Sequence, residues 1–213
     1  MHQSVYPERM LRLGFSVCLG RGLLGALAAA LCLWGVSSPA LAYRLTAADE
    51  AGLRRGEVIV HALESEGRAS HIVAAVDVAA PVDALWRLVT DCQESLKYVP
   101  GLEECDVLER AADGSWDVRQ QSLRTFPFLP RMNVQFRMAY TPEHEIRYAQ
   151  TEGSFDQLDG VWRLTPLADG RGTRVYYEAN VAMGGLVPRS MIRGSLVSNA
   201  REVLEGVRRE ALR

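Results

Sequence analysis

The sequence predicts an α+β fold in which a long antiparallel meander of strands precedes a long C-terminal helix. Alternation of apolar and polar residues is clearest over Met132 to Tyr140, as expected for a strand with one buried face. Near the C-terminus the apolar residues instead recur every three or four positions, which indicates one stripe of a helix about 20 residues long. That stripe comprises Ile192, Leu196, Ala200, Val203, Val207 and Ala211.

Local signals predict the remaining elements in order. Ala47 to Arg55 has the pattern of a short helix, and two strand-like segments, Glu57 to Leu63 and Ser70 to Val78, are spaced as a hairpin. Pro81 opens an amphipathic helix, and a second short helix over Glu94 to Tyr98 must stop at the following Pro-Gly pair. Six further strands are expected at Leu102 to Arg110, Trp116 to Arg124, Met132 to Tyr140, Glu145 to Thr151, Val161 to Leu167 and Thr173 to Val181.

Residues 1–42 have the pattern of a secretory signal peptide. Arg9, Arg12 and Arg21 precede an apolar run from Leu23 to Val36, and Ala40-Leu41-Ala42 is a typical cleavage motif. The run is shorter than the ~20 residues that span a bilayer, which disfavours the alternative of a retained anchor. We therefore expect cleavage after Ala42, a periplasmic or secreted protein, and a single mature domain over residues 43–213.

Composition narrows the function classes. The chain has 213 residues, 48% of them hydrophobic, and a formal net charge of −2, so it is an ordinary globular protein without the excess positive charge typical of nucleic-acid binding. After signal cleavage two cysteines remain, Cys92 and Cys105. In an oxidising compartment they are candidates for a disulfide, the alternative being two separate half-buried thiols. Neither a metal site nor a cofactor is expected, because these cysteines have no histidine nearby.

Several segments resemble the SRPBCC superfamily, which includes START lipid-transfer domains, pollen-allergen-like carriers, polyketide cyclases and coenzyme Q-binding proteins. The resemblance rests on VAAPVDALWRLVTD (Val78 to Asp91), YVPGLEE (Tyr98 to Glu104), the segment from Glu152 to Glu178 and the last helix. It implies a helix-grip fold: a curved antiparallel sheet of about seven or eight strands around the C-terminal helix, with two short helices after the first strands.

A sheet curved around one helix encloses space, which implies a mainly apolar ligand cavity. The residues expected to line it are Val118, Val134, Phe136, Met138, Tyr148, Trp162, Leu164 and Tyr177 from the strands, with Ile192 and Leu196 from the helix. A hydrophobic small molecule or lipid is the expected partner. A solidly packed core without a ligand, as in a structural or interaction module, is the alternative.

Two loops are expected at the cavity entrance. One is an apolar loop containing Phe126, Phe128 and Leu129, and the other contains Gly184, Gly185 and Leu186. Exposed apolar loop tips beside a cavity can contact a bilayer transiently or control ligand passage. Folding of the first loop back onto the core is equally compatible with its sequence.

The sequence gives little support for catalysis, and no catalytic residue is assigned. It contains no nucleophile elbow, phosphate-binding loop or metal-ligand motif, and the three histidines of the mature chain are expected at the surface. The alternative is a polyketide cyclase or dehydrase acting on an apolar substrate. Its polar contacts would come from Arg119, Gln121, Tyr148, Tyr176 and Asn180, provided that each faces the interior, and a one-residue error in strand register reverses every such assignment.

Overall fold

The structure is a computed structural model that describes residues 43–63, 69–124, 131–183 and 189–213. Contacts divide the chain into two units, Met1–Leu41 and Ala42–Arg213, and all described residues belong to the second. The predicted signal peptide therefore lies outside the described residues. No helix of the described segments is both long and apolar enough to cross a bilayer.

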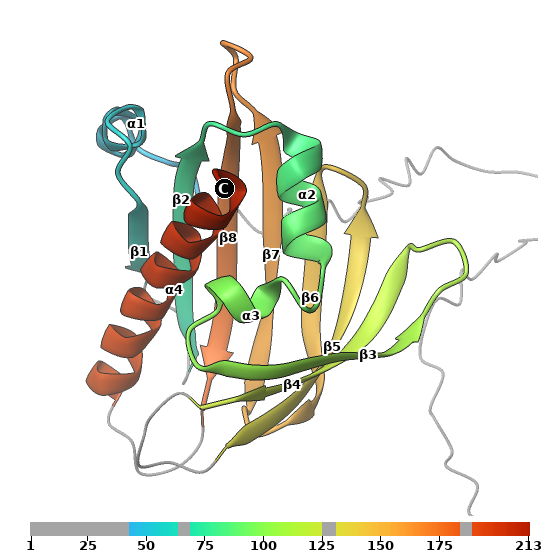
Figure 1. Ribbon diagram of the computed structural model, residues 1–213. Coiled ribbons are helices and arrows are strands. Elements are labelled where there is room, and N and C mark those ends of the chain that lie inside the picture. Colours follow the sequence, from blue (N-terminus) through green and yellow to red (C-terminus); the bar gives the residue numbers. More distant parts are fainter. Residues whose placement is uncertain (1–42, 64–68, 125–130, 184–188) are drawn as a thin grey trace, which may run out of the picture. The chain divides into compact units, whose positions relative to one another are not determined.

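A single antiparallel sheet of eight strands forms the framework (Figure 1). Its strands lie side by side in the order β1-β2-β8-β7-β6-β5-β4-β3, so the meander from β3 to β8 meets the first hairpin at the β8–β2 pair. The strands are β1 Ile59–Leu63, β2 Ser70–Val78, β3 Leu102–Arg110, β4 Trp116–Leu123, β5 Met132–Thr141, β6 Glu145–Gly153, β7 Gln157–Pro166 and β8 Thr173–Ala182. The sheet curves, and β3 and β4 sweep across its lower part in Figure 1.

Four helices accompany the sheet: α1 Ala47–Arg54, α2 Val82–Thr90, α3 Ser95–Tyr98 and α4 Arg189–Ala211. The long helix α4 crosses the concave face in front of β2 and β8, and α2 lies in front of β6 and β7 (Figure 1). This arrangement confirms the predicted helix-grip fold. Most strand boundaries lie within two residues of the predicted ones, and the largest difference is that β7 begins at Gln157, four residues before the predicted start at Val161.

The core lies between the concave face and the helices. Val76, Leu85, Val175, Leu204 and Val207 have no exposed side chain there, because strand and helix stripes meet face to face. Burial of these aliphatic side chains is the main favourable contribution to folding.

Gly206 allows α4 to approach α3 closely. A Cβ at this position would lie only 2.8 Å from Cβ and 2.9 Å from Cα of Tyr98. This glycine therefore lowers helix propensity at a point where a larger residue would push the two helices apart.

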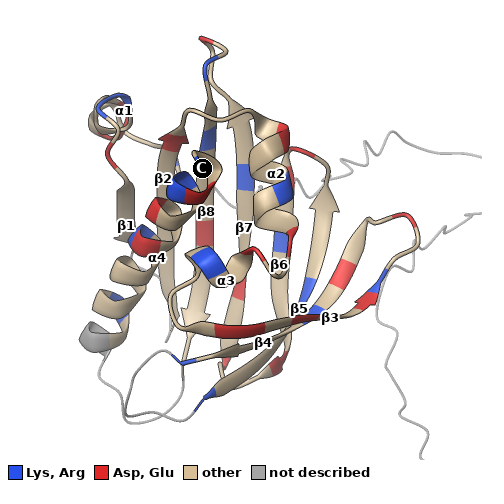
Figure 2. Cartoon of the chain, in the orientation of Figure 1, with Lys and Arg blue, Asp and Glu red and all other residues tan. Residues whose placement is uncertain are grey.

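Charged residues of both signs are distributed over the helices and strands. Figure 2 shows acidic and basic residues interspersed over α1, α4 and β3, with no large area of one sign in this view. This mixture of signs along the chain agrees with the small formal net charge of −2.

Candidate functional site

The strand register decides which side chains face α4. Residues directly opposite each other on neighbouring strands share a face of the sheet. One such row runs from Met138 through Tyr148 and Gly160 to Ala179 and Ile72, and Ile72 belongs to the core beneath α4. Of the predicted cavity residues, those on this concave face are Val134, Phe136, Met138, Tyr148, Trp162, Leu164 and Tyr177.

On α4, Leu196 packs against the core cluster and is half-buried, and Ile192 is also half-buried. Val118 does not belong to the concave face. It pairs with Arg137 and lies between Asp117 and Arg119, which are buried and face the interior. The prediction for Val118 was wrong because β4 turns Asp117 and Arg119 toward the interior, so that Val118 between them lies on the opposite face of the sheet.

Aromatic side chains from four strands form a row on the concave face, which we call the aromatic row: Phe136, Tyr148, Tyr177 and Trp162. Ring centroids are 5.9 Å apart for Phe136 and Tyr148, 6.4 Å for Tyr148 and Tyr177, and 4.8 Å for Tyr177 and Trp162. Phe136 is buried, whereas the other three are only half-buried although they face the interior. The row therefore offers partly exposed ring surface to an apolar molecule on this face.

Tyr148 and Tyr177 are joined through their hydroxyl groups. Tyr148 Oη donates to Tyr177 Oη over 3.0 Å, and the two rings are nearly parallel, with 9° between their planes. Burial raises the pKa of Tyr177, and burial together with the neighbouring Tyr177 holds the pKa of Tyr148 well above its ordinary value. Both phenols are therefore neutral hydrogen-bonding groups at physiological pH.

Gly160 makes the contact between these tyrosines possible. It lies on β7, between the strands that carry them, directly opposite Tyr148. A Cβ here would lie 2.5 Å from Oη and 2.7 Å from Cζ of Tyr148, and it would also collide with the carbonyl oxygen of Glu178. Because Gly160 has no side chain, the phenol of Tyr148 can lie across β7 and reach Tyr177.

Polar groups also face the interior. Gln150 lies opposite Phe136 and donates to the carbonyl of Phe155, which leaves its Oε1 buried without a partner; among the described residues it is the one such side-chain atom. Of the predicted polar contacts, Arg119, Gln121 and Tyr148 share the concave face. Tyr176 and Asn180 lie on the opposite face, where they bond Glu178 and Asp159 respectively.

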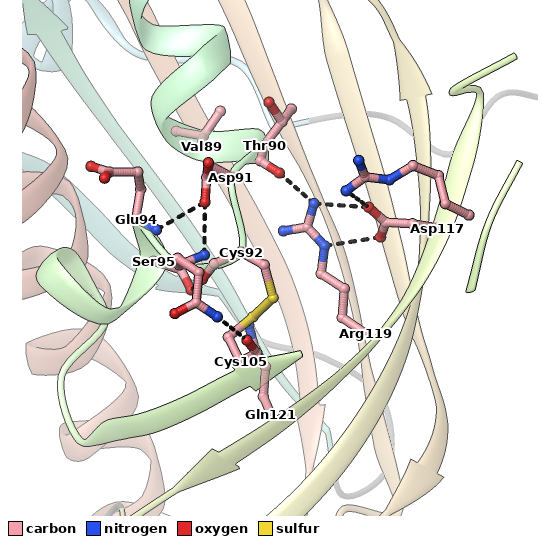
Figure 3. The surroundings of a disulfide bond; sticks show 12 residues. Val89, Thr90, Asp91, Cys92, Glu94, Ser95, Cys105, Asp117, Arg119 and Gln121 are labelled. Atoms are coloured by element: carbon pink, nitrogen blue, oxygen red, sulfur yellow. Dashed lines mark hydrogen bonds and ion pairs between the residues drawn. A yellow bond between two sulfur atoms is a disulfide. The ribbon is translucent and has the colours of Figure 1, made fainter. Parts of the chain in front are cut away.

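Arg119 belongs to a buried ion pair that the sequence did not predict. Its Nε donates to Asp117 Oδ1 over 2.9 Å and its Nη2 to Asp117 Oδ2 over 3.0 Å, with both side chains at most 3% exposed (Figure 3). Nη2 also donates to the carbonyl of Thr90 at the end of α2 and to Tyr140 Oη. The pair therefore fixes α2 to β4 and β5, and the pKa of Arg119 is raised despite its burial, because Asp117 stabilises the charge.

A groove of about 630 Å³ lies between α2, β3 and the β5–β6 turn. Trp86 and Tyr140 provide aromatic surface in it, and Asp117 is part of its lining. Cys92 and Cys105 also line it and form a disulfide with a Cα–Cα distance of 5.6 Å, which ties the α2–α3 connection to β3 (Figure 3). Nothing in the periodicity of the sequence indicated this groove.

The three histidines of the described segments lie away from the aromatic row. His61 bonds Asp49 of α1 over 2.8 Å, His71 bonds Glu178 over 2.7 Å, and His144 is exposed in a turn. Within the described segments no group of three or more His, Cys, Asp or Glu is placed to hold a metal ion.

The predicted entrance residues fall outside the part of the chain that the structure describes. They are Phe126, Phe128 and Leu129 in the first loop and Gly184, Gly185 and Leu186 in the second.

Residues 78–208 match the sequence family described as "Polyketide cyclase / dehydrase and lipid transport". The chain belongs to this family. The match spans more than half of the chain and confirms the resemblance to the SRPBCC superfamily. No curated protein matches the sequence significantly.

Solved structures share the fold. A STAR-related lipid transfer protein from Xanthomonas axonopodis superposes with a TM-score of 0.63 at 15% identity, covering 73% of this chain and 94% of that one. The Zhui aromatase/cyclase from Streptomyces sp. R1128 gives 0.59 at 21% identity, covering 68% and 94%. A START superfamily protein from Mycobacterium smegmatis gives 0.59 at 17% identity, covering 67% and 97%. At these identities the likeness establishes the fold alone.

Proposed function

We propose that this protein is a non-enzymatic periplasmic carrier that binds a hydrophobic small molecule, such as a lipid, a quinone or a polyketide-like compound, on the concave face between the sheet and α4. The observation that carries this proposal is the aromatic row, in which Tyr148, Trp162 and Tyr177 face the interior and yet remain partly exposed. A fully packed core would bury such rings completely.

The family supports the same class of ligand. Its description includes lipid transport, and one structure with the same fold is a STAR-related lipid transfer protein. The periplasmic location is supported by the signal-peptide pattern of residues 1–42. Contact of the apolar loop around Phe128 with a membrane surface would allow the carrier to load and release its ligand.

The described residues favour a carrier over a cyclase. General acid–base catalysis at neutral pH needs a group that exchanges protons near pH 7. The tyrosines of the aromatic row retain their protons because their pKa values are raised, and Arg119 stays charged beside Asp117. The histidines, which are the usual candidates, lie outside the concave face.

Native mass spectrometry of protein purified from the periplasm without detergent tests the proposal. We expect an added mass that organic solvent releases as an apolar compound. Leu196→Glu, which places a charge on the inner side of α4, should reduce this occupancy, whereas Gly194→Glu on the exposed side should not, because a side chain there meets open space. Wild-type protein that is empty and also fails to bind 1-anilinonaphthalene-8-sulfonate would overturn the carrier function.

Fractionation tests the location. The mature protein should be released with the periplasm and should begin at Tyr43. Recovery in the cytoplasm with residues 1–42 still attached would contradict it.

A further inference from the structure

The hydroxyl pair of Tyr148 and Tyr177 has one proton more than it uses. Two phenols supply two protons, and the single hydrogen bond between them consumes one. With Tyr148 as the donor, the remaining proton belongs to Tyr177. None of the described residues accepts this proton. The other contacts of the Tyr177 side chain are the ring contacts with Tyr148 and Trp162 and its packing against the core cluster.

The surroundings of Tyr177 make this free donor significant. Its strand neighbours are Ala74 and Trp162, and it packs against the apolar core cluster. A hydroxyl that is taken from water into apolar surroundings loses free energy unless it finds an acceptor. A purely hydrocarbon ligand would impose that loss, whereas a ligand with a suitably placed oxygen would avoid it.

The rings around this hydroxyl favour a flat partner. Trp162 lies against Tyr177 with a centroid distance of 4.8 Å, and the ring of Tyr148 is nearly parallel to that of Tyr177 at a centroid distance of 6.4 Å. Aromatic faces and edges of this kind pack well against another ring system. The donor therefore lies beside aromatic rings, which are surfaces suited to packing against another ring system.

We propose that the ligand is a planar, ring-containing molecule that carries a hydrogen-bond acceptor, such as a ketone or quinone oxygen, and that Tyr177 donates its hydroxyl proton to that oxygen. This inference rests on the proposed carrier function and specifies the chemistry of its ligand. Tyr148 acts as a positioning residue because its own donation holds the Tyr177 oxygen and leaves the Tyr177 proton available. Gly160 provides the space in which Tyr148 does so.

Two nearly isosteric probes test the inference. The ketone 2-acetylnaphthalene carries an acceptor oxygen where 2-isopropenylnaphthalene carries a methylene group. Equilibrium dialysis against the folded wild-type protein should show tighter binding of the ketone by about five- to tenfold, the ratio that one net hydrogen bond supplies. Tyr177→Phe, which keeps the ring and removes the hydroxyl, should reduce this ratio to about one.

Tyr176→Phe is the matched control. This neighbour also loses one hydroxyl, but its side chain lies on the opposite face and bonds Glu178, so the ketone preference should be unchanged. Tyr148→Phe should retain a preference, because the Tyr177 proton remains, at a smaller ratio.

The outcomes separate the two proposals. If the wild type binds neither probe, the carrier function itself fails. If it binds both equally, or if Tyr177→Phe keeps the full preference, a hydrophobic site exists but the acceptor requirement is wrong. The wild-type ratio needs no variant, so the inference can be refuted even if Tyr177→Phe does not fold.

Discussion

Replacing Gly160 by alanine is the sharpest test of how the aromatic row is built. The new methyl group would collide with the phenol of Tyr148 and with the carbonyl oxygen of Glu178 on the neighbouring strand. The backbone contact cannot be relieved by rotating a side chain, and Tyr148 can move only by giving up its hydrogen bond to Tyr177. Overpacking of this kind typically costs about 1–3 kcal/mol. The lost hydrogen bond adds about 1 kcal/mol.

We therefore expect Gly160→Ala to lower the free energy of unfolding by about 2–4 kcal/mol in urea titrations followed by circular dichroism. Gly194→Ala is the control, since a Cβ there meets nothing within 4 Å, and it should be neutral or stabilising. In a Tyr148→Leu background the cost of Gly160→Ala should fall, because one of the two colliding groups is gone. A cost below about 0.5 kcal/mol in the wild-type background, the level of an ordinary surface substitution, would refute this account of Gly160.

Three further perturbations follow from the described contacts. Arg119→Met should lower the free energy of unfolding by about 3 kcal/mol in urea titrations, because buried Asp117 keeps only the more distant Arg110, at 3.7 Å, as a charged partner. Arg119→Met combined with Asp117→Leu should be closer to wild type, and equal losses in the single and double variants would contradict this explanation. Reduction of the Cys92–Cys105 disulfide, whose cysteines are 13 residues apart, should lower the free energy of unfolding by about 3 kcal/mol. Unchanged thermal stability in dithiothreitol would contradict a stabilising role of this disulfide. Burial alone would raise the pKa of Asp49, but hydrogen bonds from the Thr46 backbone, His61 and the Thr46 side chain lower it from 3.8 to about 2. Ionised Asp49 thus stabilises the fold by about 2.5 kcal/mol above pH 5, and this contribution disappears as the pH falls through about 4 to 2. Asp49→Asn should have a lower free energy of unfolding than wild type at pH 7. If the difference between the two proteins is as large at pH 2, the ionisation of Asp49 is not its cause.

The order of elements was predictable from the sequence because each has a local cause. Pro81 precedes α2, the Pro100-Gly101 pair follows α3, and the apolar stripe of α4 has a clear helical period. These signals act over a few residues and do not depend on the rest of the fold. The start of β7 was missed because Gly160 interrupts the apolar pattern there, whereas in the structure it is paired within the ladder.

The face of each strand was harder to predict than its existence. On β5 the apolar residues face the core, so Phe136 and Met138 are on the expected side. On β4, Asp117 and Arg119 form an ion pair. Asp117 also accepts a hydrogen bond from Tyr140, and Arg119 donates to the carbonyl of Thr90. This polar face can therefore be buried while Val118 points outward. The partners Thr90 and Tyr140 are distant in the sequence from this pair, so alternation of hydrophobicity along β4 cannot reveal that its polar face is buried.

The two halves of α4 have different roles, which separates the stability of the fold from the binding of a ligand. In the C-terminal half, Val203, Leu204 and Val207 are at most 5% exposed. In the same half, Arg201 and Arg208 donate to the carbonyls of Val58 and Gly56 over 2.8 and 2.6 Å, at the start of the outermost strand β1. In the N-terminal half, the described apolar residues Ile192, Leu196 and Val197 are half-buried, and Arg193 donates to the carbonyl of Ala62 on β1. Because the fully buried residues of α4 lie in its C-terminal half, we expect substitutions of half-buried Leu196 to alter ligand binding more than folding. Equal losses of both would show instead that the apolar stripe acts as one packing surface.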